Sequence, residues 1–350
     1  MTLRLSRRHL LLGALMPLPA WALPPRGLQF PRDFGSHPDL RTEWWYITGQ
    51  ATSGARVFGF QVTFFRSRIA ETQAMQSAFA ARQLIFAHAA MTDLAGGKLL
   101  HDQRIARAGM GVAEASEGDT RVHLRDWLLE RKAEEYSARI PASGFALDLR
   151  FMPTQPPLLQ GDAGLSRKGP EVEQASYYYS EPQLATSGRI TLRGQPFDVQ
   201  GKAWLDHEWS EAYLHPDAAG WDWIGMNLAD GSALMAFRMR LKTGGVLWAG
   251  GSFRAAGGMA KPFAPGEVAF EPLRVWKSTA SQASYPVEWK VRTPAGSFVV
   301  KALLDDQELD SRGSTGAIYW EGLSDLLDEK GKPVGRGYLE MTGYAAALRL

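Results

Sequence analysis

Short runs of alternating apolar and polar residues, separated by turn residues, recur along most of the chain. Residues 57–65 (VFGFQVTFF) and 145–151 (FALDLRF) show this alternation, and both runs carry several aromatic side chains. Further runs flank the turn segments 193–195 and 242–245, as the two strands of a β-hairpin would. Short strands at this spacing are typical of antiparallel barrels and sandwiches. We therefore predict an all-β fold with few short helices.

The chain has no cysteine among its 350 residues. This composition excludes a disulfide framework, a thiolate nucleophile and a zinc site with cysteine ligands. The length and the 45% hydrophobic content are sufficient for two domains or for one large β-rich domain. The stability of either fold then has to come from packing.

The first 22 residues have the pattern of a bacterial export signal. Arg7 and Arg8 precede an apolar run at residues 10–18, and the sequence Ala-Trp-Ala at 20–22 has the spacing of a signal-peptidase site. The paired arginines favour the twin-arginine route, and the apolar run is short for a membrane span. We therefore expect residues 1–22 to be a cleaved twin-arginine-type signal peptide and the mature protein to be periplasmic or secreted.

Cleavage after residue 22 would remove three arginines, Arg4, Arg7 and Arg8, and no acid, which changes the formal net charge from +2 to −1. A nearly neutral chain without a basic run is not expected to bind nucleic acid. No other segment has the length of a transmembrane helix, and no long basic amphipathic helix is evident in the sequence. We therefore predict no nucleic-acid partner and no stable membrane insertion.

The segment 201–210 (GKAWLDHEWS) places Asp206, His207 and Glu208 in a row between Trp204 and Trp209. In a regular strand, Trp204, Asp206 and Glu208 point to one face, whereas His207 and Trp209 point to the other. Two interpretations stay open. The triplet is either the acid–base group of an apolar pocket or a buried polar cluster that fastens two sheets together.

Tryptophan is abundant, with 12 residues in the chain, and several of them lie beside single charged residues. Near the N-terminus, strand alternation groups Glu43 with Trp45 and places Trp44 and Tyr46 on the opposite face. Tryptophan rings suit the wall of an apolar ligand cavity. Core aromatic residues that donate their N–H groups to buried acids would give the same pattern.

Three histidines are candidates for the interior. His88 lies among small and apolar residues, so we expect it to point inward or to lie at the mouth of a barrel. His37, His88 and His207 could meet around a carboxylate to bind a metal, but the H-x-H and H-E-x-x-H spacings are absent. The sequence also lacks a G-x-S-x-G segment and a phosphate-binding loop. We therefore predict no metal and no other cofactor.

Six segments occur in the order found in one protein family. They are EWWYITG at 43–49, FAHAAMTD at 86–93, GKAWLDHEW at 201–209, GWDW at 220–223, YWEG at 319–322 and GYLEMTGY at 337–344. With these segments the chain resembles the AttH/carotenoid 1,2-hydratase-like family, whose exported bacterial members are called predicted secreted hydrolases. The resemblance covers essentially the whole chain after the expected export signal.

The resemblance implies two lipocalin-like (calycin-type) antiparallel β-barrels that pack side by side and provide an apolar ligand pocket. We accordingly expect an N-terminal barrel at residues 23–215 and a C-terminal barrel at 216–350. The hydratases of the family add water to a terminal alkene, and their active-site His-x-Trp pair corresponds to His207 and Trp209. Their downstream tyrosine and aspartate have no counterpart in residues 234–240.

From these features we predict a protein that binds a hydrophobic small molecule in an aromatic pocket and performs hydratase- or hydrolase-like acid–base chemistry on it. The catalytic candidates are Asp206, His207 and Glu208, because an acid buried among tryptophans would hold a proton near neutral pH. The candidates for substrate binding are Glu43, Trp44, Trp45, Tyr46, His88, Trp204, Trp209, Trp221 and Trp223. The alternative is a carrier protein without chemistry, with an envelope transporter as its partner.

Overall fold

The computed structural model describes residues 22–348 and consists almost entirely of antiparallel strands and the turns between them. Within this range, helical geometry is confined to two short 3-10 turns, η1 (Arg32–Phe34) and η2 (Ala70–Thr72). The all-β fold with few short helices is therefore confirmed. The expected export signal lies, apart from its last residue, outside the described residues.

The first sheet contains the strands β1 to β13 and curls into a nearly closed barrel. Its order is β4-β3-β2-β1-β13-β12-β9-β8-β7-β6-β5, and β10 and β11 pair with β12. From opposite ends of this order, β3 approaches β5 and β4 approaches β6. The strands are β1 (Thr42–Ser53), β2 (Arg56–Arg68), β3 (Gln83–Asp93), β4 (Lys98–Arg107), β5 (Ala113–Ala115), β6 (Arg121–Leu124), β7 (Trp127–Lys132), β8 (Glu135–Pro141), β9 (Phe145–Met152), β10 (Leu158–Leu159), β11 (Leu165–Arg167), β12 (Ala175–Leu192) and β13 (Gln195–Ser210).

The second sheet contains ten strands in the order β17-β16-β15-β14-β23-β22-β20-β19-β18, and β21 pairs with β22. It wraps around a second apolar core that includes Trp289 and Trp320. The strands are β14 (Ala218–Leu228), β15 (Ala233–Leu241), β16 (Val246–Arg254), β17 (Ala260–Phe263), β18 (Ala269–Lys277), β19 (Ser284–Thr293), β20 (Gly296–Ala302), β21 (Glu308–Ser311), β22 (Ala317–Leu327) and β23 (Pro333–Met341).

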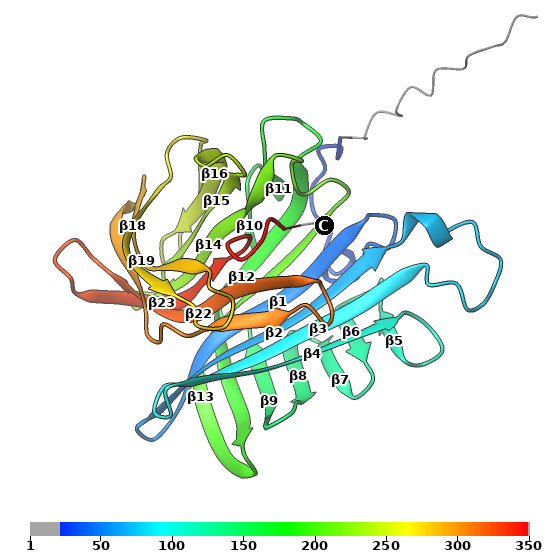
Figure 1. Cartoon of the computed structure of the whole chain (residues 1–350), viewed down its shortest axis with the longest axis horizontal. Coiled ribbons are helices and arrows are strands. Elements are labelled where there is room, and N and C mark those ends of the chain that lie inside the picture. The colour runs from blue at the N-terminus through cyan, green and yellow to red at the C-terminus, as the bar shows by residue number, and fades with distance from the viewer. Residues whose placement is uncertain (1–21, 349–350) are drawn as a thin grey trace, which may run out of the picture.

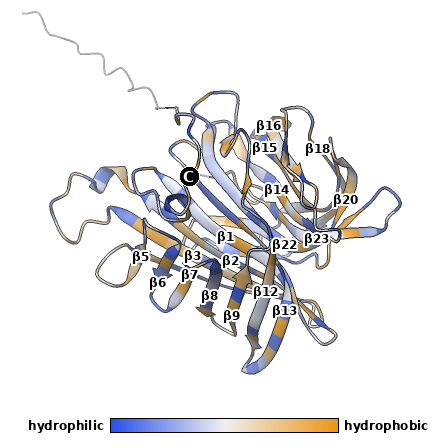
Figure 2. Cartoon of the chain, turned by 180° about the vertical axis from the view of Figure 1, so that it is seen from behind, coloured by the Kyte–Doolittle hydropathy of each residue, from blue (hydrophilic) through white to orange (hydrophobic). Residues whose placement is uncertain are grey.

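Strand alternation determines which side chains form each core. In β9, Phe145, Leu147 and Leu149 are buried inside the first barrel, whereas Asp148 and Arg150 between them are exposed. Figure 2 shows the same alternation of apolar and polar residues along β13. The hairpin turns expected at 193–195 and 242–245 join β12 to β13 and β15 to β16, respectively. The periodicity of the sequence therefore predicts both the strands and their inward faces.

The two sheets lie side by side, the first running from blue to green and the second from yellow-green to red in Figure 1. A third apolar cluster joins them and includes Tyr46, Trp204, Trp223 and Tyr338. These side chains come from the outer faces of the first barrel's β1 and β13 and from the second sheet's β14 and β23. The two lipocalin-like barrels packed side by side are thus present. The chain passes between the sheets from residue 210 to 218, the segment in which we placed the domain division.

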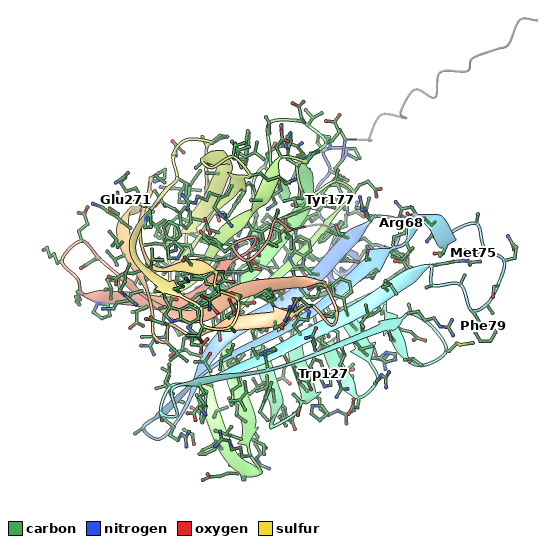
Figure 3. All side chains as sticks on the ribbon, in the orientation of Figure 1. Arg68, Met75, Phe79, Trp127, Tyr177 and Glu271 are labelled. Carbon is green, nitrogen blue, oxygen red and sulfur yellow. The ribbon has the colours of Figure 1, made fainter. Side chains whose placement is uncertain are left out.

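The loop between β2 and β3 projects from the first barrel. Met75 and Phe79 lie on this loop with their side chains exposed, at the far right of Figure 3. No helical segment of residues 22–348 has the length and apolar character needed to span a membrane.

The interaction with an envelope transporter, which we expect if the protein is a carrier, stays a prediction.

Candidate functional site

Strand β13 divides the predicted catalytic triplet between two environments. Asp206 and Glu208 point out of the first barrel toward the second sheet, and their side chains bond to Tyr178 and Ser176 of the neighbouring strand β12. His207 points the opposite way, into the first barrel, where its ring stacks on Trp45. The alternation deduced from the sequence is therefore correct. The three residues do not form one acid–base cluster, however, because neighbouring side chains of a strand point to opposite faces.

Inside the first barrel, Glu43 is the centre of a hydrogen-bonded network. Its Oε1 lies 2.8 Å from Nδ1 of His37 and 2.9 Å from Nε2 of His207. Its Oε2 accepts hydrogen bonds of 2.8 Å from Nε of Arg66 and 2.9 Å from the hydroxyl of Ser36. We call these five residues the Glu43 network. Both oxygens of the carboxylate are engaged in hydrogen bonds within the protein. We therefore interpret the network as a structural one that stabilises the barrel.

The charge states within the Glu43 network follow from its contacts. Burial alone would raise the pKa of Glu43, but hydrogen bonds from His207 and His37 and the charge of Arg66 hold it well below its usual range. Burial lowers the pKa of His207 to about 4, with partial compensation by Glu43, so its ring is neutral at pH 7. The ring nitrogens of His37 lie 2.8 Å from Oε1 of Glu43 and 3.0 Å from Oδ1 of Asp33, so the ring bridges the two carboxyl groups.

The tryptophans beside this network belong to the barrel core. Trp45 and Trp209 are fully buried, and Trp209 stacks on His37 with ring centroids 3.9 Å apart. Trp45 and Trp209 thus lie in the barrel core, and Glu43 is bonded within its network. A role of these three residues in substrate binding stays a prediction. His207 and Trp209, the pair that the family resemblance assigns to the active site, also point into the first barrel.

The Glu43 network also contains the one set of three metal-type ligands that residues 22–348 bring together. Donor atoms of His37, Glu43 and His207 lie within 4.8 Å of one another. Both histidines already hydrogen-bond to the carboxylate, and Arg66 bonds to its second oxygen. A metal ion would have to displace these hydrogen bonds and would lie beside the positive charge of Arg66. The three side chains therefore fit a hydrogen-bonded network better than a metal site. His88 lies elsewhere, between the sheets.

A cavity of about 300 Å³ lies between the two barrels, and we call it the inter-barrel cavity. Strands β1, β2, β3, β12 and β13 contribute one wall, and β14, β22 and β23 contribute the other. Aromatic side chains contribute much of the lining, and five residues with carboxyl groups lie among them. The lining includes Glu43, Trp44, Tyr46, His88, Tyr178, Asp206, Glu208, Tyr213, Trp221, Trp223, Ala317, Tyr319, Glu321 and Glu340.

Asp206 borders the inter-barrel cavity and is held by three donors. The Tyr178 hydroxyl lies 2.6 Å from Oδ2, and the Ser180 hydroxyl and the Trp204 indole lie 2.5 and 2.6 Å from Oδ1. Burial raises the pKa of Asp206 to about 7, although these hydrogen bonds lower it in part. A carboxyl with this pKa can both donate and accept a proton near neutral pH.

Glu208 is paired with a buried lysine. Nζ of Lys168 lies 2.8 Å from Oε1 of Glu208, and Ser176 donates a hydrogen bond to the same oxygen. The ammonium also lies 4.7 Å from the ring centroid of Tyr178 and 4.5 Å from that of Phe237. Burial raises the pKa of Glu208, while the charge of Lys168 opposes the increase. The Lys168–Glu208 ion pair therefore makes one end of the cavity polar.

Glu321 and Glu340 face each other across β22 and β23. Trp221 donates its indole N–H to Oε2 of Glu340 over 3.0 Å, whereas Oε1 of Glu321 is buried without a hydrogen-bond partner. Burial and the charge of Glu340 raise the pKa of Glu321 well above its usual range. Burial likewise raises the pKa of Glu340 to about 7. Two neighbouring carboxyls in an apolar site cannot both ionise freely, so this pair holds protons at neutral pH.

His88 also lines the inter-barrel cavity, and it points out of the first barrel, because Ala87 and Ala89 occupy the inward face of β3. Its Nδ1 lies 2.8 Å from the hydroxyl of Tyr319, and its Nε2 lies 2.8 Å from the hydroxyl of Ser314. Burial lowers the pKa of His88 to about 3, so the ring is neutral and acts as a hydrogen-bonding wall residue.

The structure thus brings Asp206 and Glu208 to the inter-barrel cavity. It also brings six of the predicted binding residues there, namely Glu43, Trp44, Tyr46, His88, Trp221 and Trp223. Trp204 lies behind Asp206 as its hydrogen-bond donor. Sequence reasoning missed Lys168, Tyr178, Glu321 and Glu340. A single acid within an apolar strand, as in YWEG and YLEM, marks the two glutamates, but their pairing across strands leaves no local signal.

A larger and more open hollow of about 1290 Å³ lies beside the second sheet. It is bounded by residues 154–167 and by strands β15, β16 and β17, with Phe237 and Trp248 in its apolar floor. Asp162 is its one acidic lining residue. The hollow lacks the grouped carboxyls of the inter-barrel cavity, so we place the candidate site in the smaller cavity.

The sequence pattern of the AttH-like family matches residues 21–344. The chain belongs to the AttH-like family. A solved structure of an AttH protein from Nitrosomonas europaea is 50% identical, covers 92% of this chain and 99% of its own, and superimposes with a TM-score of 0.86. The family resemblance stated from the sequence is therefore confirmed.

More distant AttH-like folds occur in two named proteins. Kievitone hydratase from Nectria haematococca is 15% identical, with a TM-score of 0.72 and coverage of 91% of this chain and 93% of that chain. CghA is 14% identical, with a TM-score of 0.54 and coverage of 87% and 89%. At these identities the likeness concerns the fold alone. A search of curated proteins found no match.

Proposed function

We propose that this AttH-like protein binds an apolar small molecule in the inter-barrel cavity and performs hydratase- or hydrolase-like acid–base chemistry on it. The observation that carries the proposal is Asp206, a carboxyl with a pKa of about 7 that borders an aromatic cavity and bonds to Tyr178. A proton donor or acceptor is most effective when its pKa lies near the working pH. An apolar ligand that fills an aromatic cavity displaces the water that would compete with it.

A hydration illustrates how these groups would act. Proton transfer from Asp206, directly or through the Tyr178 hydroxyl, to one carbon of an alkene leaves a carbocation at the other carbon. The faces of Trp223 and Trp44 would stabilise that positive charge. Water then adds to the cation, and its surplus proton returns to Asp206, so the acid is regenerated. The shared fold of kievitone hydratase, which is named as a hydratase, supports this class of reaction.

The proposal predicts that Asp206→Asn lowers turnover by about 100- to 10,000-fold, the usual range for loss of a general acid. The reaction can be followed as incorporation of ¹⁸O from labelled water into a panel of apolar alkenes and esters, with mass-spectrometric detection. Asp198→Asn is the matched control, because Asp198 lies exposed on the same strand. Full turnover in Asp206→Asn would contradict acid–base chemistry at this residue. Ligand binding without conversion by the wild type would identify a carrier.

We also propose that the chain is exported by the twin-arginine route, on the basis of Arg7 and Arg8 before the apolar run. Replacement of both by lysine is expected to retain the protein in the cytoplasm, as measured by immunoblotting of periplasmic and cytoplasmic fractions. Arg4→Lys serves as the control, because Arg4 lies outside the pair. Unchanged periplasmic yield of the twin-lysine variant would show that another route is used.

A further inference from the structure

The inter-barrel cavity holds more carboxyl groups than cations to match them. Glu208 pairs with Lys168, and the Glu43 carboxylate, which also borders the cavity, pairs with Arg66. None of the ion pairs formed by residues 22–348 involves Asp206, Glu321 or Glu340. A buried carboxyl is tolerated when it is protonated or when a positive charge lies beside it. The cavity therefore has three carboxyls that could accept a cation.

Two polar atoms at the same end of the cavity have no hydrogen-bond partner. They are the hydroxyl of Tyr46 and Oε1 of Glu321, and both residues are more than nine-tenths buried. Buried polar atoms without a partner are uncommon and costly, by roughly 1–3 kcal/mol each. The two side chains lie beside each other, because Glu321 is among the groups that raise the pKa of Tyr46, but neither atom has a partner in hydrogen-bond geometry. Since both residues line the cavity, a donor group of a ligand beside them would complete their hydrogen bonding.

The surroundings favour an organic cation over a metal ion. Among residues 22–348, His37, Glu43 and His207 are the one set of three metal-type ligands whose donor atoms converge, and no such set includes Glu321 or Glu340. The space around the two glutamates is bounded instead by aromatic rings. The Trp221 indole bonds to Glu340, and the Trp223 ring packs edge-on against Tyr46 with centroids 5.5 Å apart. Rings with nearby carboxylates are the usual surroundings of alkylammonium groups.

We propose that the ligand of the inter-barrel cavity is an apolar molecule with a positively charged amine, and that Glu321 and Glu340 hold this amine while the aromatic walls hold its apolar part. The inference rests on the proposed function that the cavity binds an apolar ligand. It assigns the glutamate pair to recognition and leaves proton transfer to Asp206. Burial and the neighbouring carboxyls raise the pKa values of both glutamates, and a cation beside them would lower these values again.

Three probes of equal chain length test the inference, namely decylammonium, decanol and decanoate. Their binding is measured by titration calorimetry and by the fluorescence of the cavity tryptophans. Decylammonium is expected to bind at least about tenfold more tightly than decanol, a difference of about 1.4 kcal/mol, and decanoate is expected to bind most weakly. The double variant Glu321→Gln/Glu340→Gln is expected to bind decylammonium and decanol equally. Glu329→Gln, in the exposed turn of the same hairpin, should retain the wild-type preference.

The outcomes separate the inference from the function on which it rests. Equal affinity of the wild type for decylammonium and decanol would overturn the proposal that the ligand carries an amine. The proposal that the cavity binds an apolar ligand would stand. Absence of binding by all three probes would overturn both. Glutamine has the shape of a protonated glutamate, so the double variant is expected to fold, and its melting temperature verifies this. A preference for decylammonium that survives in the double variant would also overturn the role of the glutamates.

Discussion

Replacement of Glu43 by glutamine is expected to lower the free energy of unfolding by about 3–5 kcal/mol, the usual effect of removing one partner of a buried ion pair. The amide retains the size of the side chain but not its charge. Arg66 would then lie buried without a counter-charge, and both His37 and His207 would lose the oxygen to which they donate. Urea denaturation of purified protein, followed by tryptophan fluorescence, measures the loss.

The matched control for this prediction is Glu134→Gln, which removes a charge from an exposed turn of the same barrel. We expect that change to alter stability by less than about 0.5 kcal/mol. The account of the Glu43 network as a structural one that stabilises the barrel would be wrong if Glu43→Gln were as stable as the control. It would also be wrong if His207→Ala abolished ligand conversion while stability remained unchanged, because the ring points away from the cavity.

The second large effect concerns pH and Asp206. Burial raises its pKa from an ordinary value of 3.8 to about 7 in the folded protein. The folded state therefore holds a proton that the unfolded state releases between these values. The contribution of this group to stability is full below pH 3.8 and is lost as the pH rises through 7. From pH 5 to pH 8 the loss amounts to about 3 kcal/mol.

Asparagine at position 206 does not titrate, so Asp206→Asn is expected to lack this pH dependence. The difference in unfolding free energy between wild type and variant should therefore shift by about 3 kcal/mol in favour of the variant from pH 5 to pH 8. A comparison of the two curves is needed because His88 and His207, with pKa values near 3 and 4, act in the opposite direction below pH 6.5. A difference that stays constant with pH would show that Asp206 is ionised in the folded protein at pH 5.

Much of the fold follows from the period of the sequence. The alternation in 145–151 predicts strand β9 and its buried face, and the turns at 193–195 and 242–245 predict two hairpins that the structure contains. The same period correctly separates Asp206 from His207. These features depend on residues that lie within a few positions of one another, so they can be predicted from the sequence alone.

The composition of the site depends on pairings that the sequence does not display. Glu321 and Glu340 meet because β22 pairs with β23, and Tyr178 meets Asp206 because β12 pairs with β13. Lys168 comes from a segment that reads as a loop. For the same reason, Trp45 and Trp44 could not be assigned in advance to the barrel core and to the cavity. Alternation shows that they point apart, but the identity of each face depends on which sheet packs against it.

The central claim, that the inter-barrel cavity holds an apolar compound, is tested most directly by native mass spectrometry of the protein isolated from its own cells. The comparison is between the wild type and Ala317→Trp, in which an indole at the start of β22 would fill a half-buried part of the cavity wall. We predict one bound compound per wild-type chain and none in the variant. Bare protein mass for the wild type, or equal retention by both proteins, would contradict the claim.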